Sequence, residues 1–346
     1  MTDENKTTEL NGGEANSKTS LDGEIKKLVS LKMFCTPGHK GTLKKDDITE
    51  IDGVFPLDFV ERAQRETAKY FKAEHLRYLT NGSSIGIKAA LLGTGDILAN
   101  AGCHPSIAQA AQLSGAKIYY IDADIRDGLT LPPTKKQVET ALGRFPDTGV
   151  VVLTAPDYYG LMPDAGAAKA VKKAGLRLLI DGAHATHAFF RPDLFDTSIF
   201  KYADMFNLSA HKTLGAYTQT AYLCVSDAEI KRVDRNLKLL GTTSPYYPFM
   251  ARLQAAADEA YNNRAVYDDL YKAVKAFKKR INCLKNDDFT RIVVDCKDVG
   301  DTKAIYRRLL QNGIAAEKYD ERHIVFIVTL CDKAEDVDRL AEELGR

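Results

Sequence analysis

Short apolar runs alternate with amphipathic segments through the first two thirds of the chain. The apolar runs are four to six residues long, which is typical of strands buried in a sheet. The segments between them carry apolar residues at helical spacing, most clearly over residues 59–71, 106–113 and 134–142. This alternation predicts an α/β domain with a mainly parallel sheet. The expected strands cover residues 76–79, 97–100, 117–121, 150–154, 176–180, 205–208 and 220–225.

The two ends of the chain differ from this alternating part. Residues 1–20 are polar and cannot bury enough surface to fold, so we expect a disordered tail there. A helical pattern over residues 248–284 leads into a β-α-β-α pattern, which predicts a small α+β domain. We therefore divide the chain into the tail (1–20), a large domain (21–245) with an N-terminal arm (21–50), and a linking helix with the small domain (246–346).

Composition and charge narrow the class of function. The 346 residues include 48 Lys and Arg against 47 Asp and Glu, a net charge of +1. Because no basic excess would attract nucleic acid or a membrane surface, we expect small-molecule or protein partners. The six cysteines form no C-x-x-C pair, so we expect neither a metal site nor disulfides. The chain shows no apolar signal segment and no run of membrane-spanning length, which favours a cytoplasmic protein.

Polar residues follow three of the expected strands. Gly82-Ser83-Ser84 opens a helix, where exposed N–H groups, two hydroxyls and the helix dipole suit a phosphate. Asp181 ends a buried strand, and a carboxylate there needs a cationic or hydrogen-bonding partner. Lys212 lies in a Ser-x-His-Lys-Thr segment, where an amine can be held for Schiff-base chemistry with a carbonyl. Because ligands of parallel sheets gather beyond the carboxyl ends of the strands, we expect these residues to share one site.

Histidines and tyrosines follow further strands. His104 precedes a helix, where an imidazole can stack on a flat cofactor ring or move protons near neutral pH. Tyr158 and Tyr159 come after another strand, and for at least one of them ordinary packing is the preferred interpretation. His184 and His187 have the i, i+3 spacing of metal ligands on a helix, but no third ligand accompanies them at a recognisable spacing.

Each of these features also has an ordinary interpretation. Lysines are far more often solvated than reactive, a lone strand-end aspartate can cap the next turn, and serine is a favoured helix N-cap. The run Gly82-Ser83-Ser84-Ile85-Gly86 also fits G-x-S-x-G, the nucleophile elbow of a hydrolase, with Ser84 as the nucleophile. The set as a whole favours a cofactor site, because Ser-x-His-Lys stands 31 positions after Asp181 in the same chain as the phosphate-type turn and His104.

This set resembles the large-domain pattern of the Orn/Lys/Arg decarboxylase family, bacterial enzymes that use pyridoxal 5'-phosphate (PLP) and have the aspartate-aminotransferase fold, fold type I. Asp-x-x-His followed by Ser-x-His-Lys is the most specific part, and the similarity spans roughly residues 30–340. The matching motifs are Pro37-Gly38-His39-Lys40-Gly41, Asp47-Ile48-Thr49-Glu50, Thr80-Asn81-Gly82-Ser83-Ser84, His104-Pro105-Ser106, Pro156-Asp157-Tyr158-Tyr159-Gly160, Asp181-Gly182-Ala183-His184, Ser209-Ala210-His211-Lys212-Thr213 and Thr242-Thr243-Ser244-Pro245. The resemblance implies a three-layer α/β/α large domain and a small α+β C-terminal domain.

The resemblance also implies a role for each matching residue. Lys212 would form a Schiff base with PLP, Asp181 would pair with the pyridine nitrogen, and His104 would stack over the ring. His184 would lie beside the cofactor. The residues implied to hold the phosphate are Ser83, Ser84, Ser209 and His211, with Thr242 reaching the phosphate of a neighbouring subunit.

The reaction implied is decarboxylation of a basic amino acid such as lysine, arginine or ornithine, in a homodimer with active sites at the interface. Four positions depart from the family pattern: Gly182 stands where the family has Glu, Ala185 where it has Gly, Pro105 where it has Lys, and Asp157 where it has Thr. The chain length further predicts a short form without the usual C-terminal domain. Transamination, elimination or racemisation with the same cofactor stays open, as does a non-catalytic protein that retains the fold.

Overall fold

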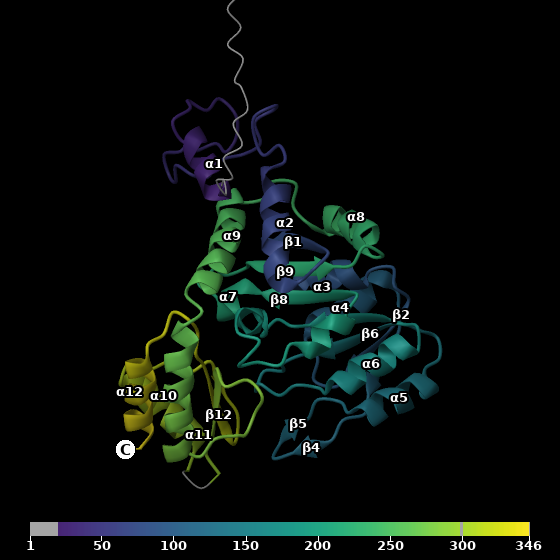
Figure 1. Cartoon of the computed structure of the whole chain (residues 1–346), viewed down its shortest axis with the longest axis vertical. Coiled ribbons are helices and arrows are strands. Elements are labelled where there is room, and N and C mark those ends of the chain that lie inside the picture. The colour runs from purple at the N-terminus through teal and green to yellow at the C-terminus, as the bar shows by residue number, and fades with distance from the viewer. Residues whose placement is uncertain (1–19, 298–299, 346) are drawn as a thin grey trace, which may run out of the picture.

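The computed structural model describes residues 20–297 and 300–345. The tail expected over residues 1–20 lies outside this part, apart from Ser20, whose hydroxyl accepts a hydrogen bond from the N–H of Gly23 at 3.1 Å. One large and one small sheet organise the described residues, and helices pack against both (Figure 1). None of the described helices combines the length and the apolar character needed to cross a membrane.

Seven strands form the large sheet, in the order β1-β9-β8-β7-β6-β2-β3. The pairs from β8 to β3 are parallel, whereas β9 runs antiparallel to both of its neighbours, so the predicted mainly parallel sheet is confirmed. The central strands are continuously apolar because helices cover both of their faces. The bounds are β1 His75–Leu79, β2 Asp96–Asn100, β3 Ile118–Ile121, β6 Thr148–Thr154, β7 Arg177–Asp181, β8 Met205–Ser209 and β9 Ala221–Val225.

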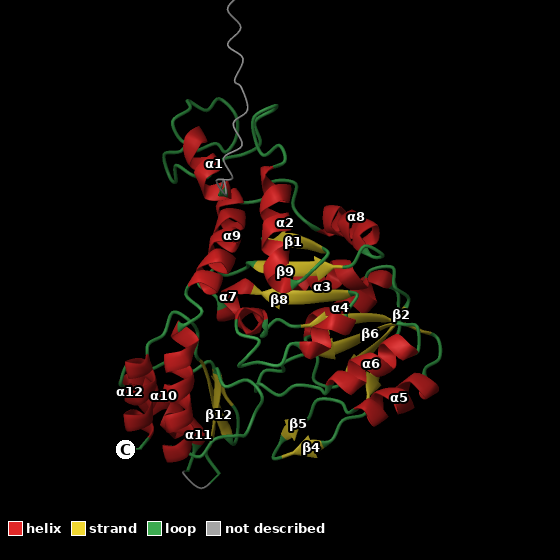
Figure 2. Ribbon diagram, in the orientation of Figure 1, coloured by secondary structure: helices red, strands yellow, loops and turns green. Residues whose placement is uncertain are grey.

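Helices on the two faces of this sheet complete three layers (Figure 2). The α-helices are α1 Leu21–Leu28, α2 Phe59–Phe71, α3 Ser83–Leu91, α4 Pro105–Ser114, α5 Lys135–Arg144, α6 Ala165–Lys173, α7 Ala210–Thr213, α8 Ile230–Leu240 and α9 Tyr247–Asn262, with the 3₁₀ helices η1 Thr186–Phe190 and η2 Ser198–Tyr202. Ile87 of α3, Ile107 of α4 and Val233 of α8 pack into the core on one face. The helices α2, α5, α6 and α9 supply the core on the opposite face. The α/β/α architecture implied by the resemblance is therefore confirmed.

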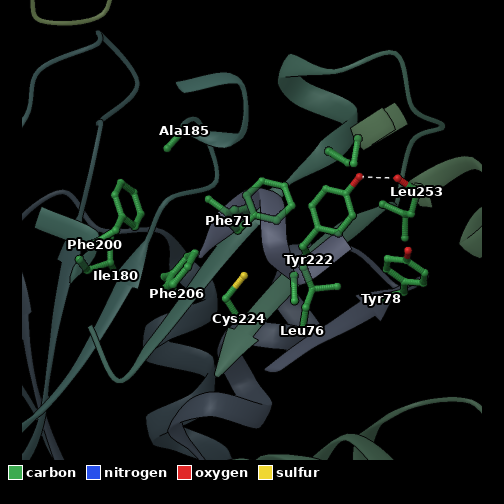
Figure 3. Close-up of a cluster of buried hydrophobic side chains, with 14 of the residues drawn as sticks. Phe71, Leu76, Tyr78, Ile180, Ala185, Phe200, Phe206, Tyr222, Cys224 and Leu253 are labelled. Atoms are coloured by element: carbon green, nitrogen blue, oxygen red, sulfur yellow. Dashed lines mark hydrogen bonds between the residues drawn. The ribbon is translucent and has the colours of Figure 1, made fainter. Parts of the chain in front are cut away.

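An aromatic cluster fills the layer between α2 and the sheet (Figure 3). The ring of Phe71, which is only 1% exposed, lies 5.7 Å from that of Phe190 and 5.1 Å from that of Tyr222. The hydroxyl of Tyr222 donates a hydrogen bond to the carbonyl of Leu253 in α9 at 2.6 Å. This cluster therefore joins α2, η1, β9 and α9 in one packed unit.

A small antiparallel sheet follows α9, in the order β10-β12-β11. Its strands are β10 Arg291–Asp295, β11 Lys318–Tyr319 and β12 His323–Ile327, and its helices are α10 Val266–Arg280, α11 Thr302–Gln311 and α12 Ala334–Leu344. The helical pattern expected over residues 248–284 is present, but in two helices rather than in a single linking helix. It divides into α9 and α10 at Asn262 and Asn263, because asparagine competes with helical hydrogen bonding and favours helix ends. The predicted domain boundary at residue 246 stays a prediction, since α9 packs into the core of the large sheet.

A two-stranded hairpin beside the large sheet was not expected from the sequence. It joins β4 Ile125–Arg126 to β5 Leu129–Thr130. The turn between them, Asp127-Gly128, has φ values of 55° and 79°, which suit the Asp-Gly pair of a tight hairpin. Strands of only two residues lack the length from which an alternating pattern can be recognised.

Candidate active site

The parallel strands bring their carboxyl ends to one edge of the large sheet. The amide oxygen of Asn100, at the end of β2, accepts a hydrogen bond from the N–H of Thr154, at the end of β6, at 2.8 Å. A cavity of about 380 Å³ lies at this edge, and the loops that follow the strands and the β4–β5 hairpin form its wall. Its lining includes Gly102, Cys103, His104, Thr130, Asp157, Tyr158, Tyr159, Asp181, His184 and Lys212.

The predicted site residues fall into two groups, with Thr242 apart from both. Those that line the cavity are His104, Asp181, His184 and Lys212. Those that lie outside its lining, at neighbouring strand ends, are Ser83, Ser84, Ser209 and His211. Thr242 belongs to neither group, because it is exposed after α8 and its hydroxyl accepts a hydrogen bond from the N–H of Ser244 at 3.1 Å.

Lys212 lies on the short helix α7, directly after β8. Its Nζ is 3.2 Å from Nε2 of His184, within hydrogen-bond distance. Burial lowers the pKa of Lys212, the Asp181 carboxylate opposes this effect, and Arg291 adds to it. A lysine with a lowered pKa is a better nucleophile near neutral pH than an ordinary one.

Asp181 ends β7 and is 3% exposed. One carboxylate oxygen accepts a hydrogen bond from the N–H of Ala183 at 3.2 Å. Burial raises the pKa of this carboxyl, whereas the charge of Lys212 and the Ala183 N–H act in the opposite direction. A buried carboxylate in this state gains from a cationic partner, which a protonated pyridine nitrogen would supply.

The N-terminus of α3 has the features of an anion-binding site. Its N-cap residue, Gly82, has a φ of 78° and no side chain to cap the helix, so N–H groups of its first turn stay available to an anion. The hydroxyl of Ser83 shares a hydrogen bond with that of Ser209, which joins this turn to the end of β8. Strands β1 and β8 each run antiparallel to β9, so they point in the same direction. The turn that follows β1 therefore lies at the same edge of the sheet as Lys212, which follows β8. These residues fit the phosphate of PLP.

His211 and His104 are held by hydrogen bonds of opposite kinds. Nδ1 of His211 donates to the carbonyl of Thr220 at 2.9 Å, so this ring can donate from Nε2 to a phosphate only when protonated. Nδ1 of His104 accepts from the N–H of Ser106 at 3.2 Å and lies 2.8 Å from its hydroxyl, at the start of α4. The neutral His104 ring therefore carries its proton on Nε2. Stacking of His104 on a cofactor ring stays a prediction.

Sequence analysis did not identify Arg291, the first residue of β10, as part of the site. Its side chain is fully buried, and its Nη2 lies 3.0 Å from Nδ1 of His184. Burial lowers the pKa of His184 well below its usual value, and the charges of Arg291 and Lys212 add to this effect. The ring of Tyr158 packs against that of His184 at 4.9 Å. The available signal was a charged residue opening the apolar run at residues 292–294, which is too common a pattern to indicate a site.

The hydrolase interpretation receives no support from the geometry of Ser84. In the described part of the chain, Ser84 makes no side-chain hydrogen bond to a histidine, and a serine nucleophile needs such a base. Ser84 lies in the first turn of α3, where its hydroxyl is better placed for an anion.

Asp157, one of the four departures from the family pattern, lies in the cavity wall. Its Oδ1 accepts hydrogen bonds from the N–H groups of Tyr159 at 2.8 Å and Leu161 at 2.9 Å. Burial raises the pKa of this carboxyl to about 6. The folded protein therefore binds this proton more tightly than the unfolded chain does, and stability falls as the pH rises from about 4 to about 6.

Replacement of this carboxyl in Asp157→Asn should remove that cost, because an asparagine oxygen can accept the same two hydrogen bonds. The free energy of unfolding of the variant should match that of the wild type near pH 3. The variant should exceed the wild type by about 2–3 kcal/mol above pH 7. Urea unfolding followed by circular dichroism across this range measures the difference. A difference that does not change with pH would contradict a raised pKa at Asp157.

Solved structures that share this fold include lysine decarboxylases and an enzyme solved with PLP bound. The lysine decarboxylase LdcF of Francisella novicida has a TM-score of 0.79 and 18% identity, covering 94% of this chain. This chain spans 59% of the length of LdcF. A structure of SPT with PLP has a TM-score of 0.70 and 12% identity, covering 94% of this chain and 83% of its own.

The chain belongs to the Orn/Lys/Arg decarboxylase family, because the model of that family's major domain matches residues 44–307. An arginine decarboxylase of Bacillus subtilis is 27% identical over 375 residues, which cover 94% of this chain and 76% of that protein. The uncharacterized protein YaaO of the same organism is 28% identical over 337 residues, which cover 87% of this chain and 69% of that protein. The family and the relatives indicate a PLP-dependent amino-acid decarboxylase.

Proposed function

We propose that this protein decarboxylates a basic amino acid, such as lysine, arginine or ornithine, through a Schiff base between Lys212 and PLP. The observation that carries the proposal is the placement of the Lys212 amine and the Asp181 carboxylate in the wall of one cavity. PLP requires two groups at opposite sides of its ring, an amine and a carboxylate. Lys212 offers an amine with a lowered pKa, and Asp181 offers a buried carboxylate without a full counter-charge.

The cofactor, when bound, supplies an electron sink for the pair released as carbon dioxide leaves the α-carbon. The chain would orient it at three points. Asp181 would hold the proton of the ring nitrogen, while the N-terminus of α3 with Ser83, Ser84, Ser209 and His211 would bind the phosphate. His104 would cover the ring and His184 would lie beside it. Nζ of Lys212, or a histidine of the wall, would donate the proton that replaces the lost carboxylate.

We further propose that the protein acts as a homodimer, with Thr242 near the phosphate site of the partner. Several large apolar side chains of the N-terminal arm are exposed in the single chain, among them Phe34 at 90% and Leu43 at 84%. An exposed set of this kind is typical of a protein–protein interface. The mass of the protein in solution tests the association.

The Schiff base is tested by the absorption spectrum of the purified protein with added PLP. The wild type should show the visible band of PLP bound covalently to a lysine, and borohydride should bleach it and leave the label on the peptide that contains Lys212. Lys212→Ala should lack the band. Lys172→Ala, which removes a lysine paired with Asp204 outside the cavity, should retain it.

Carbon dioxide release from lysine, arginine and ornithine then tests the reaction. Release from one of them by the wild type, and its loss in Lys212→Ala, is the expected result. A covalent band with a different product would replace decarboxylation by another PLP-dependent reaction. A correctly folded wild type that shows no band would overturn the proposal, since every one of these reactions requires the cofactor.

A further inference from the structure

A buried arginine from the small sheet reaches the lysine site through a histidine. Nη2 of Arg291 lies 3.0 Å from Nδ1 of His184 and 3.3 Å from the carbonyl oxygen of the same residue. Nη1 donates to the hydroxyl of Thr290 at 3.0 Å. A fully buried guanidinium is costly unless its position is fixed by such contacts, so this arrangement holds Arg291 in one place.

The contact between Arg291 and His184 has only one possible direction. A guanidinium carries donors and no acceptor, so Nδ1 of His184 must be the acceptor and cannot carry a proton. The remaining proton of the neutral ring is then on Nε2. Protonation of Nδ1 would point an N–H at the Arg291 donor and place two cations side by side, which the buried site disfavours.

The tautomer of His184 also fixes the donor and the acceptor in its contact with Lys212. Nε2 of His184 lies 3.2 Å from Nζ of Lys212. With its proton on Nε2, the imidazole donates, and Lys212 can accept only through the lone pair of an unprotonated amine. The unprotonated amine is the form that attacks a carbonyl carbon.

Other charged groups face Lys212 from the neighbouring elements. Asp181, at the end of β7, and Glu317, next to β11, favour the protonated amine. Arg291 acts in the opposite direction, and together with burial it outweighs them, so that the pKa of Lys212 is lowered. The hydroxyl of Tyr158 donates a hydrogen bond to Glu317, which occupies part of that carboxylate.

His184 has charged neighbours on its other side. Asp288 favours the protonated imidazole, and His187 disfavours it. One carboxylate oxygen of Asp288 is engaged, since Oδ1 accepts from the hydroxyl of Thr290 at 2.6 Å and lies 3.3 Å from Nε2 of His187. Burial and the charge of Arg291 therefore prevail, and His184 stays neutral.

We propose that Arg291 is a positioning residue that sets the tautomer of His184, and that His184 in turn holds Lys212 as the unprotonated amine. The importance of that amine rests on the proposed function, but the tautomer of His184 can be measured without it. A residue of the small sheet would thereby set the state of a lysine that directly follows strand β8 of the large sheet.

The tautomer is read directly by NMR of the wild-type protein labelled with ¹⁵N at histidine, without added PLP. The His184 signals, assigned by their absence in His184→Gln, should report a proton on Nε2 and none on Nδ1 from about pH 6 to 8. A proton on Nδ1, or a doubly protonated ring in this range, would overturn the proposal. This measurement stands even if the protein never captures PLP, so failure of the proposed function is seen separately.

The link to Lys212 is read from the pH dependence of covalent PLP capture, followed by the visible band. In Arg291→Met the His184 tautomer should become mixed, and the pH of half-maximal capture rate should rise by about 1–3 units. Arg291→Lys, which keeps a charged donor, should restore the wild-type tautomer and move the profile back. Arg232→Met, which removes a largely buried arginine of α8 outside the site, should leave both readouts unchanged.

A merely structural role would predict a different outcome. If Arg291 only fills space, methionine should leave the tautomer and the pH profile as they are and change only the amount of folded protein. That result would overturn the proposal. If Arg291→Met does not fold, the NMR spectra of Arg291→Lys and of the wild type test the proposal. A proton on Nδ1 of His184 in the Arg291→Lys variant would contradict the proposed tautomer equally well.

Discussion

Asp181→Asn should leave the protein folded and yet lower the rate of the proposed amino-acid decarboxylation by roughly 10²–10⁴-fold. Removal of one partner from a buried ion pair costs about 3–5 kcal/mol, and each 1.36 kcal/mol is a factor of about ten in rate. The lost partner here is the carboxylate that would keep the pyridine nitrogen of PLP protonated. Carbon dioxide release and the PLP titration of the same preparation measure the effect.

The same substitution should leave the free energy of unfolding unchanged or increase it. Burial raises the pKa of Asp181, so the ionised carboxylate costs stability at any pH above its value in the unfolded chain. Without added PLP, Asp181→Asn should therefore unfold at the same or a higher urea concentration than the wild type at pH 7. Asp96→Asn, at the opposite end of β2, serves as the matched control and should keep full activity. An Asp181→Asn enzyme with nearly wild-type turnover would exclude Asp181 as the partner of the ring.

Phe71→Ala should destabilise the protein by about 3–5 kcal/mol, the usual cost of removing a large aromatic side chain from a packed core. Phe71 is 1% exposed and contacts the rings of Phe189 and Phe190. It also contacts the ring of Tyr222 (Figure 3). The cavity left behind would lie where α2, η1 and β9 meet. Because the chain contains no tryptophan, circular dichroism is the suitable signal for urea unfolding.

A graded control separates the loss of volume from a change of fold. Phe71→Leu keeps most of the apolar volume and should cost less than about 1.5 kcal/mol. Equal destabilisation by alanine and leucine would show that the aromatic ring contacts, rather than the filled volume, hold this region together.

The fold class was predictable because its signals are local. Runs such as residues 150–154 and 176–180 are apolar over the length of one buried strand, and the segments between them have helical spacing. The strand ends then predict that Asp181 and Lys212 share one edge of the sheet. The family pattern supplied the cofactor and the proposed role of each residue.

The features that the sequence did not predict depend mainly on contacts between distant parts of the chain. Arg291 is 107 positions from His184, and the apolar run that follows residue 291 describes only a strand that begins with a charge. The break between α9 and α10 and the two-residue strands of the β4–β5 hairpin were missed because a short interruption has too few residues to change a periodicity. Side-chain roles set by burial, such as that of Asp157, likewise cannot be seen in a linear pattern.

The antiparallel pairing of β1 with β9 also sets the order in which the chain can fold. The paired residues His75 and Val225 stand roughly 150 positions apart, and such long-range pairings form late because a large loop must close first. At synthesis rates of about 5–20 residues per second, β1 leaves the ribosome roughly 7–30 s before its partner strand. During that interval its backbone groups have no strand to pair with, and α2, which packs against β1, is the local element that can shield it. The sheet that carries Lys212 is completed only once β9 has been made.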